Sequence, residues 1–121
     1  MGSFATLYLP AEADHAALAA RLRAVRGIER VLTRAEAAAA YELPPERIGD
    51  LVVIAERFVV LGTALAKHDL SGLDAPLRSH GGVSEQRIPI IVNRPLHGVD
   101  SARRWRNFDV FDLLLNHVAH P

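Results

Sequence analysis

Short hydrophobic patterns organise the first part of the chain. The run from Phe4 to Leu9 is dense in aromatic and apolar residues and stops at Pro10, which predicts a β-strand. Asp14 stands at the N-cap position of a following amphipathic helix, and Gly27 lies where a C-terminal cap is expected. The apolar positions of this helix are Leu18, Leu22 and Val25. The pattern predicts a strand followed by a helix.

The next segment repeats this order. Ile28 to Leu32 is predicted as a second short strand. Thr33 and Glu36 have the spacing of a capping box, and the alanine run Ala37 to Ala40 has high helix propensity. Leu43–Pro44–Pro45 ends this second helix. Residues 1–46 therefore form a strand, helix, strand, helix segment with no evident chemistry.

Residues 47–121 carry the longer apolar runs. Leu51 to Ala55 is continuously apolar, which is typical of a strand covered on both faces. Phe58 to Leu61 and Ile88 to Val92 are predicted as further strands, the second one buried, with Pro89 near its start. A final helix is expected from about Asn107 to Val118.

These elements predict an α/β fold with a mixed sheet and flanking helices, divided into residues 1–46 and 47–121. The boundary between the two segments follows the proline break. The positions expected to be buried are Leu22, Val25, Val52, Ile54, Ile90, Val92, Phe111 and Leu115.

Composition narrows the classes of function. The chain has 121 residues, and its 14 basic and 14 acidic side chains cancel, which argues against a nucleic-acid or membrane-surface partner. It has no cysteine, no apolar run long enough to span a membrane and no signal-peptide pattern, so we expect a cytoplasmic location.

One histidine stands out as candidate chemistry. His80 is followed by Gly81 and Gly82, which allow a tight turn with positive φ. A histidine at such a corner presents a ring nitrogen to a cleft, and imidazole is a good zinc ligand at neutral pH. The same short motif is also compatible with a glycine turn that carries a surface histidine without function.

Other polar pairs are interpreted as structural. The Asp14–His15 pair opens a helix, where Asp is expected as a cap. Asp50 precedes a strand and is expected to cap it or to pair with Arg47. Lys67–His68–Asp69 is interpreted as a solvated turn, because neighbouring residues of an extended segment point to opposite faces. His117 is expected at the surface.

A small basic group surrounds the tryptophan near the C-terminus. Arg103, Arg104 and Arg106 flank Trp105 in a chain without net charge. We expect these arginines to pack against Trp105 and to pair with carboxylates.

The longer string LRSHGGVSEQRIPIIVNRPL resembles the C-terminal part of the phosphonoacetate hydrolases, which belong to the alkaline phosphatase superfamily. The resemblance extends upstream through ELPPERIGDLVVIAERFVVLG and HDLSGL, and downstream through RNFDVFDLLLNHV. It covers about Tyr8 to Val118. It implies a partial alkaline-phosphatase-like core with part of the cap that covers the active site.

The resemblance implies zinc chemistry and a phosphonate substrate. In the superfamily, a histidine followed by glycine completes a two-zinc site, and His80 is the matching position. The nucleophile and the other ligands have no match: Asp112 and His117 are one residue too far apart for the family's Asp-x-x-x-His pair. No catalytic residue is therefore assigned in this chain, and zinc binding by this chain alone is expected to be weak or absent.

Three functions remain open. The first is a C-terminal fragment of a zinc-dependent phosphonoacetate hydrolase, which cleaves a carbon–phosphorus bond to give acetate and phosphate. The second is a fragment of a related nucleotide phosphodiesterase or pyrophosphatase. The third is a non-catalytic α/β binding or oligomerisation module. Because a fragment of a larger sheet exposes strand edges and an apolar face, we also expect a homo-oligomer.

Overall fold

The computed structural model of the chain describes residues 2–77 and 79–119. The chain divides into two compact units, Met1–Arg87 and Ile88–Pro121, and each is described by itself. This division lies well beyond the boundary at residue 46 that the sequence suggested.

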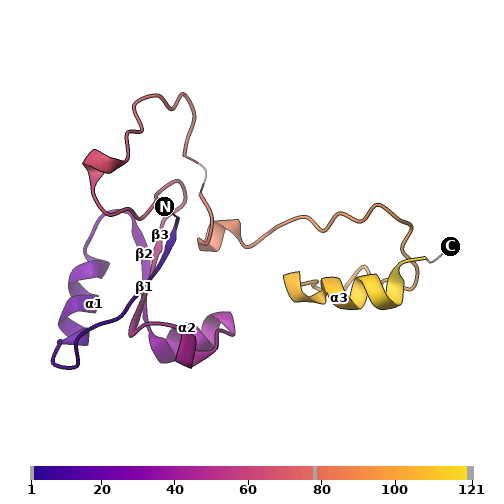
Figure 1. Cartoon of the computed structure of the whole chain (residues 1–121), viewed down its shortest axis with the longest axis horizontal. Coiled ribbons are helices and arrows are strands. Elements are labelled where there is room, and N and C mark those ends of the chain that lie inside the picture. Colours follow the sequence, from indigo (N-terminus) through magenta and orange to yellow (C-terminus); the bar gives the residue numbers. More distant parts are fainter. Residues whose placement is uncertain (1, 78, 120–121) are drawn as a thin grey trace. The chain divides into compact units, whose positions relative to one another are not determined.

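The first unit is built on a three-stranded sheet (Figure 1). Its strands are β1 (Phe4–Leu7), β2 (Ile28–Thr33) and β3 (Leu51–Ala55), in the spatial order β1-β3-β2. Both pairings are antiparallel, with Leu51 opposite Leu7 on one side and opposite Thr33 on the other. The expected α/β class is confirmed, and the sheet is antiparallel throughout rather than mixed.

The central strand β3 is buried on both faces. Leu51 and Val53 pack with Ala19 of α1 (His15–Arg23), while Val52 and Ile54 pack with Ala37 of α2 (Arg34–Tyr41). Successive side chains of a strand point to opposite faces, so a strand between two layers must be apolar at every position. This explains the uninterrupted apolar run and confirms the predicted burial of Val52 and Ile54.

Both helices of the first unit begin at the predicted caps. The Asp14 carboxylate accepts a hydrogen bond from the Ala17 N–H at 2.9 Å. The Glu36 carboxylate accepts from the Thr33 N–H at 2.7 Å, and the Thr33 hydroxyl accepts from the Glu36 N–H, which completes a capping box. Thr33 is also the last residue of β2, so α2 follows the strand with no loop between them.

The expectations for Val25 and for Phe58–Leu61 are wrong, and Leu22 is half-buried rather than buried. Val25 is 52% exposed, because α1 already ends at Arg23 and the chain turns before Gly27. Phe58–Leu61 forms no strand: Phe58 has a φ of 67°, which is incompatible with an extended segment, and only Leu61 makes an isolated bridge, to Gly2.

The second unit contains a short helix of mixed type. The α-helical turn α3 (Val110–Asp112) continues as a π-helical segment, Leu113–His117. Leu113 and Val118 are buried, whereas Phe111 and Leu115 are 70% and 74% exposed, so their predicted burial is wrong. The wider π turn shifts which positions share a face, and a pattern counted at 3.6 residues per turn then selects the wrong ones. Among the described residues, no helix has the length and apolar character needed to cross a membrane.

The predicted strand Ile88–Val92 is absent from the second unit. Its residues lie outside any strand, and Ile88, Ile90 and Ile91 are 62%, 39% and 86% exposed. Val92 is only half-buried, so the burial expected for Ile90 and Val92 is not found. A strand is stabilised by hydrogen bonds to a neighbouring strand, and none of the described segments pairs with this one.

In the basic group near the C-terminus, Arg103 is arranged as expected, whereas the Arg106 guanidinium lies 4.7 Å from the centre of the Phe108 ring. The Arg103 guanidinium lies 4.1 Å from the centre of the Trp105 ring and forms ion pairs of 2.7 Å with Asp109 and with Asp112. His117, a half-buried residue rather than a fully exposed one, packs its ring edge-on against Trp105. Hydrogen bonds from Asn116 and Arg103 hold the pKa of the Asp112 carboxyl below its usual value. This network stabilises the second unit.

Candidate metal-ligand loop

The candidate ligand His80 lies at the corner predicted from the glycines. His80 is exposed, and the following Gly81 has a φ of 86°, a conformation that strongly favours glycine. The Gly82 N–H then donates to the Glu85 carboxylate at 2.8 Å, at the start of the short helical turn Val83–Glu85. The sharp turn therefore leaves the His80 imidazole accessible while the backbone that follows is fixed.

The loop rests on the first residues of the chain. A Cβ added to Gly2 would lie 2.9 Å from the His80 ring, so the imidazole packs directly over the Gly2 backbone. In the same way, a Cβ on Gly81 would meet the Phe4 side chain at 3.0 Å, and one on Gly82 would meet Ser3 at 3.0 Å. The close approach of residues 2–4 to the loop, rather than turn geometry alone, requires small residues here.

Ser3 holds this contact together by hydrogen bonds. Its N–H donates to the His80 carbonyl oxygen at 2.8 Å, and its own carbonyl accepts from the Ala55 N–H at the end of β3 at 2.8 Å. Its hydroxyl oxygen lies 2.8 Å from the Val59 carbonyl oxygen and 2.8 Å from the Ser79 hydroxyl oxygen. This role could not be predicted from local sequence patterns, because the residues that Ser3 contacts are more than fifty positions away.

The loop offers one candidate metal ligand. An exposed imidazole on an anchored backbone suits the requirements of a zinc ligand, which must be neutral and held in place. Over residues 2–77 and 79–119, no three His, Cys, Asp or Glu side chains gather into a group able to hold a metal ion. His80 therefore fits one position of a zinc site, and the remaining ligands would have to come from outside the described residues.

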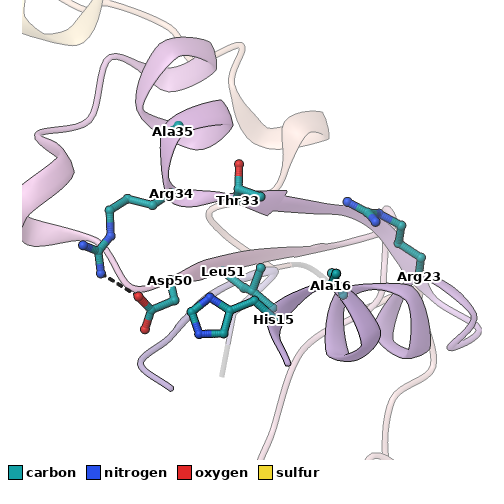
Figure 2. A pocket seen from close by; sticks show the side chains of 9 residues that line it. His15, Ala16, Arg23, Thr33, Arg34, Ala35, Asp50 and Leu51 are labelled. Carbon is teal, nitrogen blue, oxygen red and sulfur yellow. Dashed lines mark hydrogen bonds and ion pairs between the residues drawn. The ribbon is translucent and has the colours of Figure 1, made fainter. Parts of the chain in front are cut away.

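Asp50 and His15 line a separate hollow of about 570 Å³ between α1, β3 and the junction of β2 with α2 (Figure 2). The Asp50 carboxylate accepts from the Leu9 N–H and from the Arg34 guanidinium, each at 2.8 Å. The Leu9 N–H, then the charges of Arg34 and His15, hold the pKa of Asp50 below its usual value. The expected pairing of Asp50 with Arg47 is wrong. Asp50 pairs with Arg34 instead, because the pairing of β2 with β3 brings the start of α2 close to Asp50.

At Lys67–His68–Asp69 the structure differs from the solvated turn that was expected, because the Nε2 atom of His68 is buried. Asp69 accepts a hydrogen bond from the Ser71 N–H at 2.9 Å, and Ser71 lowers the pKa of the Asp69 carboxyl. The His68 ring packs over Gly62, where an added Cβ would lie 2.6 Å from it. His68 and Asp69 thus serve a turn, and no described residue joins them in a metal site.

The chain has an α/β fold that is similar to part of solved phosphonoacetate hydrolases. The crystal structure of phosphonoacetate hydrolase from Sinorhizobium meliloti 1021 in complex with phosphonoacetate matches 91% of this chain at 52% sequence identity, with a TM-score of 0.71. The crystal structure of that enzyme in complex with phosphonoformate matches equally well. The resemblance indicated by the sequence is therefore confirmed: the chain is similar to part of a phosphonoacetate hydrolase.

A sequence relative supports the same assignment. Phosphonoacetate hydrolase from Penicillium oxalicum is 62% identical over 29 residues, which are 23% of this chain and 40% of that protein. No family model matches the chain. The chain spans 27% of the solved Sinorhizobium meliloti enzyme, so most of that enzyme has no counterpart among these 121 residues.

Proposed function

We propose that this chain is a portion of a phosphonoacetate hydrolase, an enzyme that cleaves a carbon–phosphorus bond to give acetate and phosphate. The observation that carries the proposal is the 52% identity, over 91% of the chain, to an enzyme crystallised with phosphonoacetate. Identity at this level over a whole matched segment supports a shared reaction more strongly than a common fold does. We also propose that this segment lies in the C-terminal part of the enzyme.

Within that enzyme, His80 serves as one ligand of a zinc centre. The exposed imidazole, the positive φ of Gly81 and the contacts with residues 2–4 support this role. The chemistry that a bound zinc ion would supply is polarisation of a phosphoryl oxygen and activation of the attacking oxygen nucleophile. The contribution of this chain is to hold a neutral ring nitrogen at a fixed place, while the nucleophile and the other ligands belong to the rest of the enzyme.

A chimaera tests the proposal. This chain replaces the matched segment of the Sinorhizobium meliloti enzyme, and phosphate release from phosphonoacetate is measured with zinc present. The chimaera should be active, and His80→Ala should lower its activity by at least roughly 10–100-fold, the loss that even an indirect partner of a metal usually causes. His15→Ala is the matched control, because His15 is exposed and lies at the hollow beside Asp50.

The outcomes separate the alternatives. Normal activity of the His80→Ala chimaera would overturn the assignment of His80. To test the substrate, the complete reading frame around this chain is expressed and assayed on phosphonoacetate and on a nucleotide diester. Hydrolysis of the diester alone would favour the nucleotide phosphodiesterase alternative.

A further inference from the structure

Ser3 is unusual in this molecule because it is polar and yet fully inside. It is 1% exposed, and among the residues that the structure describes it is the one polar side chain that is buried. Burying a hydroxyl costs free energy unless its hydrogen bonds are made, so a buried serine with partners on several segments marks a place that the fold specifies.

The hydrogen bonds of Ser3 converge on the His80 loop. A hydroxyl has one proton and can accept as well, so when Ser3 donates to the Val59 carbonyl, the Ser79 hydroxyl donates to Ser3. The Ser3 N–H meanwhile holds the His80 carbonyl. Ser3 therefore binds Ser79 through its side chain and His80 through its backbone N–H.

We propose that Ser3 is a positioning residue for His80. The inference rests on the proposed function, in which the His80 ring nitrogen binds zinc. The Ser3–Ser79 hydroxyl pair fixes the backbone at the start of the loop, and the His80 ring packs against the Gly2 backbone. A metal ligand that is already held in its bound position loses little conformational freedom on binding, which raises metal affinity.

The first experiment measures ring position without any metal. In the 121-residue chain, the Gly2 Hα protons and the His80 ring Hε1 should give a nuclear Overhauser effect, because a Gly2 Cβ would lie 2.9 Å from His80 Cε1. Ser3→Ala and Ser79→Ala should weaken or remove it. Ser79→Ala is the cleaner variant, since it leaves the bond from Ser3 to Val59 in place and cuts only the link to the loop.

Thr6→Ala is the matched control. Thr6 lies in β1, the strand that directly follows Ser3, and its hydroxyl accepts a hydrogen bond from the Gly49 N–H, away from the His80 loop. Its loss should lower the melting temperature and leave the Gly2–His80 effect unchanged. If Ser3→Ala and Ser79→Ala lower the melting temperature but also leave that effect unchanged, Ser3 has only a structural role and the proposal is wrong.

The second experiment measures zinc affinity in the active chimaera by competition with a chelator. Ser3→Ala and Ser79→Ala should weaken zinc binding by roughly 10–100-fold, and Ser3→Thr, which keeps the hydroxyl, should restore most of it. Because the two hydroxyls act as one pair, the double variant should be no weaker than the single ones. Normal zinc affinity in both single variants, with His80→Ala still impaired, would overturn the positioning role. Normal affinity in His80→Ala as well would instead overturn the proposed zinc role of His80.

Discussion

Two segments of nearly the same composition behave differently in this chain. Leu51–Ala55 and Ile88–Val92 are both uninterrupted apolar runs except for Pro89, yet the first is the fully buried central strand and the second is an extended, exposed segment outside any strand. The first run has β1 and β2 beside it and a helix on each face. An apolar run thus shows that a segment is suited to burial, but the presence of neighbouring strands decides whether a strand forms.

The sharpest test of this difference uses the same substitution in both runs. Ile54→Ala removes a side chain that is 1% exposed and should lower the free energy of unfolding by about 2–5 kcal/mol. Ile90→Ala, at a residue that is 39% exposed, should change it by at most about 0.5 kcal/mol. Urea unfolding followed by circular dichroism measures both. Equal losses would show that Ile90 is buried in solution.

A second test asks what covers the exposed run. We expect the chain to self-associate, because Ile88 and Ile91 leave apolar surface in water. Ile91→Lys should weaken the association by about tenfold or more, since burying an isoleucine contributes about 1.5–3 kcal/mol. Leu73→Lys, at an exposed residue of the first unit, is the matched control. Sedimentation velocity over a range of concentrations measures this, and a monomer throughout would contradict it.

The smallest expected effect concerns acid. Asp50 in the first unit and Asp112 in the second both have a pKa below the ordinary value, Asp50 through the Leu9 N–H and Asp112 through Asn116. Their carboxylates therefore stabilise each unit above the unfolded pKa of about 3.9, and this stabilisation is lost as the pH falls through the lower folded pKa.

Unfolding by urea, followed from neutral pH to about pH 3, measures the effect of acid. The midpoint should fall as the solution is acidified, and Asp50→Asn should reduce this dependence because it removes the titrating group. An unchanged slope in Asp50→Asn would show that other carboxyl groups cause it.

Local signals in the sequence were sufficient for much of the first unit. The caps at Asp14 and Thr33 and the run Leu51–Ala55 act over a few residues, and all three appear in the structure as predicted. The antiparallel direction of the strands could not be predicted from local patterns, because the pairing of β3 with β1 depends on residues over forty positions apart.

The errors have physical causes that lie outside local patterns. The burial expected for Ile90 depends on neighbouring strands, and the matched enzyme is almost four times as long as the part that this chain spans. Leu115 was misplaced by a π turn that a fixed helical period does not represent. Ser3 was overlooked because a serine bound to distant backbone groups leaves no pattern in sequence. The candidate His80 could be recognised from the sequence, because Gly81 and Gly82 follow it directly.

The absence of a loop between β2 and α2 has a mechanical consequence. Thr33 is paired with Leu51 in the sheet and is at the same time the N-cap of α2, and the following Arg34 N–H donates to the Asp50 carbonyl. If β2 slipped by one residue, its side chains would exchange faces and the helix would lose its cap in the same step. The alignment of β2 and the start of α2 are therefore coupled through Thr33. A slipped pairing would lose both sets of contacts together, which disfavours slipped states of this sheet.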